Sequence, residues 1–193
     1  MMGRLTPIPV ILLSFCLFQC AGWNAYQSNM YGGRMALNVG EYERARQDFL
    51  KAAEASPDAR SYAYAATASY KMHDLPEARR LVREAERLDG KTYMILRIRG
   101  YKALILLAEG REKEGLDALN DYLAVYENAY PLETVRDVER MARSGRVDLP
   151  RLEKLLDEQI TTYENDLEQF WGTGTGWFGE RSSATAAIGG GFP

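Results

Sequence analysis

The sequence predicts an all-α protein built from antiparallel helical hairpins. A pattern that begins at Gly40 recurs 33 residues later at His73, with apolar or small residues at matching positions in the segment that follows. Small residues also stand twelve apart in three places: Gly33 with Ala45, Ala66 with Ala78, and Ala103 with Gly115. Helices joined by a tight turn approach closely only where the facing side chains are small, so each pair predicts the crossing point of one hairpin.

The second helix of each hairpin follows from its periodicity. Four and seven residues beyond the crossing point stand Phe49 and Ala52, Val82 and Ala85, and Leu119 and Tyr122. These offsets lie on one face of a helix. The third hairpin has a longer step, 37 residues from Ala78 to Gly115. Gly110 still separates two apolar-periodic segments, which predicts helices over 93–108 and 112–126.

A period close to about 34 residues, with small side chains at these positions, resembles the tetratricopeptide repeat (TPR). The resemblance implies a TPR-like α-solenoid of about three helical hairpins over residues 20–128. Two more helices are expected over 129–171. Pro131 opens the first of them and Gly145 closes it.

The last predicted helix starts at Asp148 and carries a long apolar stripe. The stripe consists of Leu152, Leu155, Leu156, Ile160, Tyr163, Leu167 and Phe170. The exposed face of a terminal repeat needs a cover, so this helix is expected to cap the solenoid. The segment 172–193 is rich in glycine with few charges and is expected to be disordered. Its aromatic residues could dock on a partner.

The N-terminus has the pattern of an export signal. Arg4 is the only charged residue before Glu41 apart from Arg34, and an apolar run covers Ile8–Phe18. This run is shorter than the roughly 20 residues that a spanning helix needs, which favours a signal peptide over 1–19. The alternative is an N-terminal anchor that is retained.

Both cysteines of the chain, Cys16 and Cys20, lie in or beside this segment. Leu17-Phe18-Gln19-Cys20 resembles the lipobox of bacterial lipoproteins, although Gln19 stands where that family has Gly, Ala or Ser. The resemblance implies cleavage before Cys20 and lipidation of its thiol. Ala21, which is not Asp, then implies an outer-membrane anchor that faces the periplasm. Ordinary cleavage after Ala21 or Gly22 is the alternative and would leave a soluble periplasmic or secreted protein.

Charge and motif content argue against several function classes. The chain has 27 acidic and 24 basic residues and no basic run, so nucleic acid is not an expected partner. Gly174–Gly179 spells G-x-G-x-x-G but follows a terminal helix, whereas a dinucleotide site needs a strand before the glycines. His73 is the single histidine and lies in a turn. We therefore expect neither an enzyme, nor a cofactor, nor a metal site.

The TPR resemblance implies a concave groove lined by the first helix of each hairpin. The matching positions are Gln27, Met30, Arg34, Leu37 and Asn38 in the first hairpin, and Arg60, Ala63, Thr67, Tyr70 and Lys71 in the second. The cations suit acidic groups of a peptide, and the apolar residues suit adaptable contact. Packing of Leu37 and Tyr70 against neighbouring helices is an equal alternative.

These features predict a non-enzymatic scaffold or assembly factor of the bacterial cell envelope that binds a protein or peptide partner. Two other hypotheses remain open. One is a regulatory or substrate-presenting subunit of a cell-wall enzyme. The other is a structural subunit that self-assembles through its C-terminal helix and tail.

Overall fold

The computed structural model describes residues 8–89, 94–129 and 134–173, with side chains from Gly22 onward except those of 126–129. These residues form helices and connecting turns, without a strand in the described ranges. The helices are α1 (Ile8–Asn38), α2 (Tyr42–Ala55), α3 (Ala59–Lys71), α4 (Leu75–Leu88), α5 (Ile95–Ala108), α6 (Glu112–Ala129), α7 (Val135–Ser144) and α8 (Leu149–Thr173). The chain divides into a first unit, Met1–Leu88, and a second unit, Asp89–Pro193.

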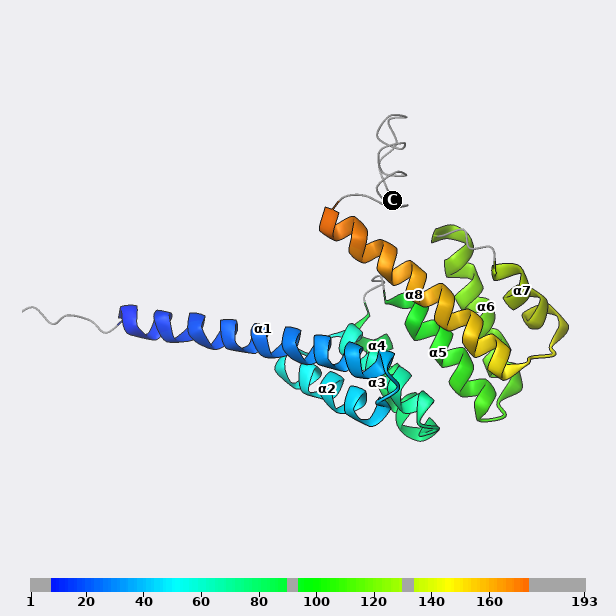
Figure 1. Cartoon of the computed structure of the whole chain (residues 1–193), viewed down its shortest axis with the longest axis horizontal. Coiled ribbons are helices and arrows are strands. Elements are labelled where there is room, and N and C mark those ends of the chain that lie inside the picture. The colour runs from blue at the N-terminus through cyan, green and yellow to red at the C-terminus, as the bar shows by residue number, and fades with distance from the viewer. Residues whose placement is uncertain (1–7, 90–93, 130–133, 174–193) are drawn as a thin grey trace, which may run out of the picture. The chain divides into compact units, whose positions relative to one another are not determined.

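Three antiparallel hairpins form as predicted. In the first unit α1 packs against α2 and α3 against α4 (Figure 1), and in the second unit α5 packs against α6. All six small residues of the predicted crossing points are buried. A Cβ atom on Gly33 would lie 2.7 Å from the ring of Phe49, and one on Gly115 would lie 2.6 Å from Cγ of Leu107. The small residues therefore leave room for a large side chain of the partner helix.

The three hairpin turns share one backbone geometry. Each has a single residue in the left-handed region: Gly40 (φ 80°), His73 (φ 60°) and Gly110 (φ 73°). In each turn this residue donates its N–H three residues back, and the next residue donates five residues back, as in a Schellman motif. The residue after the left-handed one then accepts, through its carbonyl, the N–H of the residue four positions later. These donors are Ala45, Ala78 and Gly115, and the bonds close the first turn of the second helix. The repeat seen in the sequence is thus a repeat of backbone hydrogen bonds.

The second unit continues with α7 and α8. Gly145 ends α7 with φ 64°, as predicted, whereas Pro131 lies outside the described residues and α7 begins at Val135. Asp148 starts α8, because its carboxylate accepts the N–H of Arg151 at 3.2 Å and its carbonyl accepts that of Leu152.

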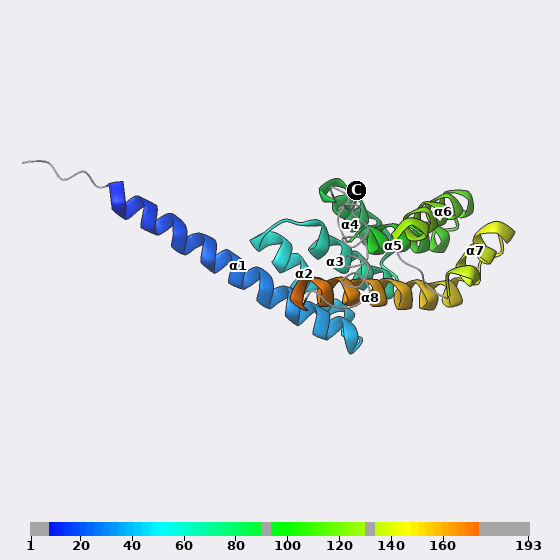
Figure 2. The ribbon, with the colours of Figure 1, turned by 90° about the horizontal axis from the view of Figure 1, so that it is seen from above.

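Helix α8 covers α5 through the predicted apolar stripe (Figure 2). Five stripe residues are buried: Leu152, Leu156, Ile160, Tyr163 and Leu167. Leu155 and Phe170 are only half-buried. Close contact is possible because Gly100 lacks a side chain, and a Cβ atom there would lie 2.9 Å from Cδ1 of Ile160. α8 therefore packs on the third hairpin, where a cap was expected.

The described helices extend past two boundaries expected from the sequence. α1 is continuous from Ile8 and so includes most of the predicted signal segment. α8 runs to Thr173, whose hydroxyl donates to the carbonyl of Gln169 at 2.9 Å and so satisfies a terminal carbonyl group. The rest of the predicted disordered tail, 174–193, lies outside the described residues. None of the helices searched in the described chain has both the length and the apolar character needed to cross a membrane.

Candidate functional site

The predicted groove residues of the first unit come from α1 and α3 and differ in exposure. Met30, Thr67 and Tyr70 are 3%, 2% and 5% exposed, and Ala63 is buried as well. Arg34, Leu37, Arg60 and Lys71 are half-buried, whereas Gln27 and Asn38 are exposed. A partner could therefore reach three cations and a few neutral groups of this face, but not its buried members.

Thr67 shows why one predicted groove residue is not available. Its hydroxyl donates to the carbonyl of Ala63, four residues earlier on α3, at 3.1 Å. A hydroxyl that donates to a carbonyl of its own helix uses its proton within that helix. Thr67 and Tyr70 thus act as packing residues of α3 in this structure.

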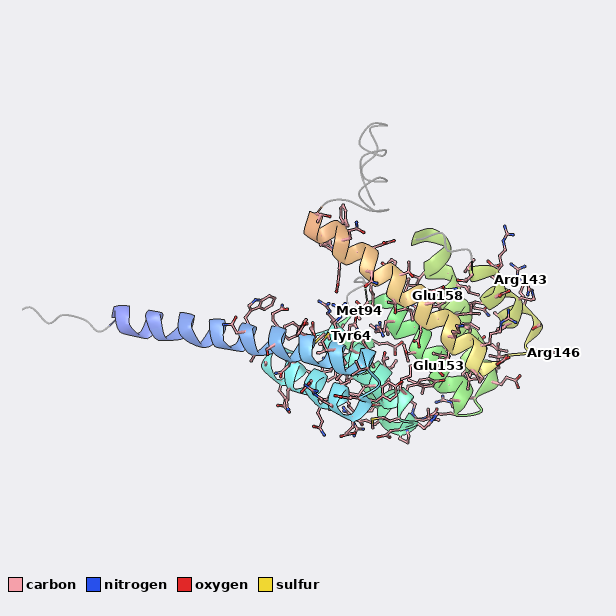
Figure 3. All side chains as sticks on the ribbon, viewed as in Figure 1. Tyr64, Met94, Arg143, Arg146, Glu153 and Glu158 are labelled. Atoms are coloured by element: carbon pink, nitrogen blue, oxygen red, sulfur yellow. The ribbon has the colours of Figure 1, made fainter. Side chains whose placement is uncertain are left out.

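Arg34 lies against Tyr64, an aromatic residue that the sequence did not mark as part of the groove. The guanidinium carbon of Arg34 is 6.0 Å from the centroid of the Tyr64 ring, which is labelled in Figure 3. Tyr64 stacks on Phe49 with centroids 5.1 Å apart and an interplanar angle of 27°. The contact joins α1, α3 and α2, at the outer limit of distance for a cation–π interaction. It orients the one cation that α1 contributes to the predicted groove.

Asp58 fixes α1 to the start of α3. One carboxylate oxygen accepts the N–H of Ser61 at 2.9 Å and its hydroxyl at 2.6 Å, which caps α3. The other oxygen accepts the hydroxyl of Tyr26 on α1 at 2.5 Å. This carboxylate therefore ties the start of α3 to α1 through its two oxygens.

The second unit contains the matching face of the third hairpin, and helix α8 occupies that face. Arg97 stands 37 residues after Arg60, the same step that relates Ala66 to Ala103. Arg97 Nε lies 2.8 Å from Glu164 Oε1, and Arg97 Nη2 lies 2.8 Å from Glu164 Oε2. The two residues are 6% and 4% exposed. An arginine at a groove position therefore holds a carboxylate of helix α8 in bidentate geometry.

Further polar contacts hold α8 in place. Tyr101 donates its hydroxyl to Asp157, and Tyr122 donates to Gln159 Oε1 at 2.8 Å. Gln159 in turn donates to the hydroxyl of Thr134 at 3.0 Å, so its buried amide is satisfied on both sides. Burial, with the nearby carboxylates of Glu164 and Asp89, raises the pKa of Tyr163. None of this network was evident from the sequence, because its members are far apart along the chain.

A small hollow of about 180 Å³ lies between α6 and α7 in the second unit. Its lining residues are Asn120, Leu123, Ala124, Glu139, Ala142 and Arg143. Arg143 Nη2 lies 3.3 Å from Glu139 Oε2, and Figure 3 shows Arg143 on the outer side of α7. Within the described residues, no group of three His, Cys, Asp or Glu side chains is arranged to hold a metal ion.

Comparison with known proteins shows which solved structures share this fold. No protein-family model matches the chain, and no curated protein matches it in sequence. The chain is similar to the TPR domain of OM64 from Arabidopsis, with 16% identity and a TM-score of 0.56 over 64% of this chain and 98% of that one. It is also similar to the TPR2B domain of yeast Sti1, solved as a complex with pHsp70, with 19% identity and a TM-score of 0.52 over 63% and 95% of the two chains.

At these identities the likeness establishes the fold alone. The protein has an all-α, TPR-like solenoid fold, which confirms the predicted fold class.

Proposed function

We propose that this chain is a non-enzymatic TPR-like scaffold that binds an acidic segment of a partner protein on the α1 and α3 face of its first unit. The observation that supports this proposal most is the Arg97–Glu164 pair. It is an example, within this chain, of a groove-position arginine that binds a helix carboxylate. Arg60 occupies the matching position of the second hairpin and is half-buried.

The composition of the proposed face agrees with such a partner. Arg34, Arg60 and Lys71 are its charged members, and all three are half-buried. Charge-assisted hydrogen bonds from these cations to carboxylates would orient the segment, and Leu37 would add apolar contact. The TPR2B domain of Sti1, which shares the fold, was itself solved with a protein partner.

We propose further that the protein works in the bacterial cell envelope, held to the outer membrane by a lipid on Cys20 and facing the periplasm. This part rests on the lipobox-like sequence before Cys20 and on the short apolar run that precedes it. Two or more acyl chains on one residue suffice for stable anchoring. The Cys20→Ser variant is expected to leave the membrane fraction of cells, and unchanged membrane retention would contradict the anchor.

Photo-crosslinking in intact cells tests the proposed binding face. A photoreactive residue in place of the exposed Asn38 should capture a discrete partner that mass spectrometry identifies. Arg60→Glu should abolish this capture, because it places a like charge against the acidic segment. Arg83→Glu, an exposed change on α4 outside the face, is the matched control. Capture that is equal in all three proteins would overturn the proposed face, and capture of a second copy of the chain would favour a self-assembling subunit.

A further inference from the structure

A group of exposed arginines lies on α7 and at the start of α8, in the second unit. These residues, here named the arginine patch, are Arg136, Arg140, Arg143, Arg146 and Arg151. Figure 3 shows Arg143 and Arg146 on the outer side of α7 and of the turn that follows it. The segment 135–151 holds these five arginines and three acidic residues, so it is positively charged in a chain whose net charge is −3.

The acidic residues of this segment orient the arginines without covering them. Asp137 lies 3.0 Å from Arg140 and 2.8 Å from Arg151, and Glu139 lies 3.3 Å from Arg143. The side chains of these three arginines are 72%, 55% and 78% exposed, whereas those of the two acids are 31% and 24% exposed. The guanidinium groups are therefore the outermost charges, and each has more N–H donors than these contacts use.

The stability of α7 does not explain this arrangement. Arg136, Arg140 and Arg143 stand four and three residues apart, so like charges are neighbours on one side of the helix, which is destabilising. Arg136 also lies in the first turn of α7, where the helix dipole disfavours a positive charge. No acidic side chain among the described residues pairs with Arg136 or Arg146. Only Arg143, in the last turn, is favoured by the dipole.

The hollow between α6 and α7 adjoins the arginine patch at Arg143. Its volume is about 180 Å³, and its apolar lining comes from Leu123, Ala124 and Ala142. This volume is below the roughly 300–1,000 Å³ of small-molecule pockets, so it suits a single side chain. A partner of the arginine patch could therefore place one apolar side chain beside its acidic groups.

The helices on either side of the arginine patch are acidic. α6 carries five acidic residues and one basic residue, and α8 beyond Arg151 carries six acidic residues and one basic residue. These charges would repel a long polyanion, or a flat anionic membrane, that extended past the arginine patch. A short acidic segment could contact the arginines alone, because a guanidinium group matches the geometry of a carboxylate.

We infer that the arginine patch binds a short acidic segment of a partner protein, with one apolar side chain of that segment in the hollow beside Arg143. The site uses none of the residues of the α1 and α3 face, so it does not depend on the proposed function. It gives the scaffold a second surface for acidic segments.

Fluorescence anisotropy tests the inference with the full chain in a nonionic detergent. The first probe is a fluorescein-labelled peptide in which a leucine is flanked on both sides by glutamates. The second probe has serine in place of the leucine, and the third has glutamines in place of the glutamates. We expect the first probe to bind, the second to bind more weakly and the third not to bind. A first probe that does not bind, or that binds no better than either of the others, would overturn the inference.

Arg136→Glu tests the arginine patch without weakening the fold. The helix dipole favours an acidic residue in the first turn of α7, so the melting temperature should not fall. Loss of one charge-assisted contact should weaken binding of the first probe by about tenfold or more. Arg83→Glu, an exposed change on α4, is the matched control and should bind the probe as the natural protein does. Equal binding by the two variants would contradict the inference.

Ala142→Leu tests the hollow. The larger side chain would fill the space beside Arg143, so the affinity for the first probe should fall to that for the serine probe. The affinity for the serine probe itself should stay the same. A variant that still prefers the leucine probe would show that the apolar side chain binds elsewhere, and the inference would be wrong.

Three other results would also refute the inference. Loss of peptide binding in Arg60→Glu but not in Arg136→Glu would assign the peptide to the α1 and α3 face of the proposed function. Binding of phosphatidylglycerol vesicles by Cys20→Ser protein that Arg136→Glu abolishes, without peptide binding, would make the arginine patch a lipid contact. Self-association in sedimentation that Arg136→Glu abolishes, again without peptide binding, would make a second copy the partner.

Discussion

Arg97 on α5 and Glu164 on α8 form a buried bidentate ion pair between residues that are 67 positions apart in the sequence. The pair fixes the rotation and register of α8 on the third hairpin, because both guanidinium contacts must be met at once. It also occupies the position that matches Arg60 in the second hairpin. The same contact thus defines the end of the repeats and supports the ligand chemistry proposed for the first unit.

Removing one member of this pair should strongly destabilise the second unit. We expect Glu164→Ala to cost about 3–5 kcal/mol of unfolding free energy, because it leaves a buried guanidinium without its partner. The double change Arg97→Met with Glu164→Leu should recover most of that loss. Urea unfolding of the full chain, followed by circular dichroism, measures both. Arg87→Ala, which breaks the exposed pair with Glu84, is the control and should cost less than about 1 kcal/mol.

Gly33 should tolerate no side chain. A Cβ atom there would lie 2.7 Å from the ring of the fully buried Phe49, so Gly33→Ala should lower stability by about 1–3 kcal/mol through overpacking. Gly172→Ala is the comparison, since nothing lies within 4 Å of its Cβ position and alanine favours a helix. Thermal melting that shows the two variants equally stable would refute the packing account of the first hairpin.

His73 should be replaceable by glycine with a gain in stability. It is the one residue other than glycine with a left-handed backbone among the described residues, and it stands where the other two hairpin turns have Gly40 and Gly110. Glycine adopts this conformation without strain, which stabilises the folded state, but it also gives the unfolded chain more conformational entropy. The net gain in unfolding free energy should be up to about 1 kcal/mol. Gly110→His is the reverse test and should destabilise. A lower melting temperature for His73→Gly would contradict the prediction.

Stability should depend on pH through Glu77 at the start of α4. The hydrogen bond from Arg80 is the main cause that lowers the pKa of Glu77 in the folded protein. A lowered pKa contributes stability above the unfolded pKa of Glu, about 4.3, and this contribution is lost as the pH falls through the folded pKa. Glu77→Gln should therefore lower the melting temperature at pH 7. The corresponding loss of unfolding free energy should be less than about 1 kcal/mol, because the pair is exposed to solvent.

The control for this prediction is the same comparison at low pH. Once the pH is below the folded pKa of Glu77, the natural protein also carries a neutral side chain there. The difference in melting temperature between the two proteins should then disappear. A difference that persists unchanged from pH 7 to pH 2 would assign the effect to packing.

Local rules explain which parts of the fold were predictable. The turns at Gly40, His73 and Gly110, and the helix end at Gly145, follow from residues within a few positions of each other. The small residues at the hairpin crossings could be predicted for the same reason, since the two helices of a hairpin are joined by a short turn. Cys20 stays a sequence-based prediction, because its side chain lies outside those described.

The sequence by itself determined the hairpins, their spacing and the apolar stripe of α8, because hydrogen bonds and periodicity act over short distances along the chain. Only the tertiary structure decided which groove positions stay accessible. It buried Met30, Thr67 and Tyr70, placed Tyr64 under Arg34, and joined Arg97 to Glu164. These outcomes depend on which helices meet and at what rotation, and that choice is made by the packing of many side chains at once.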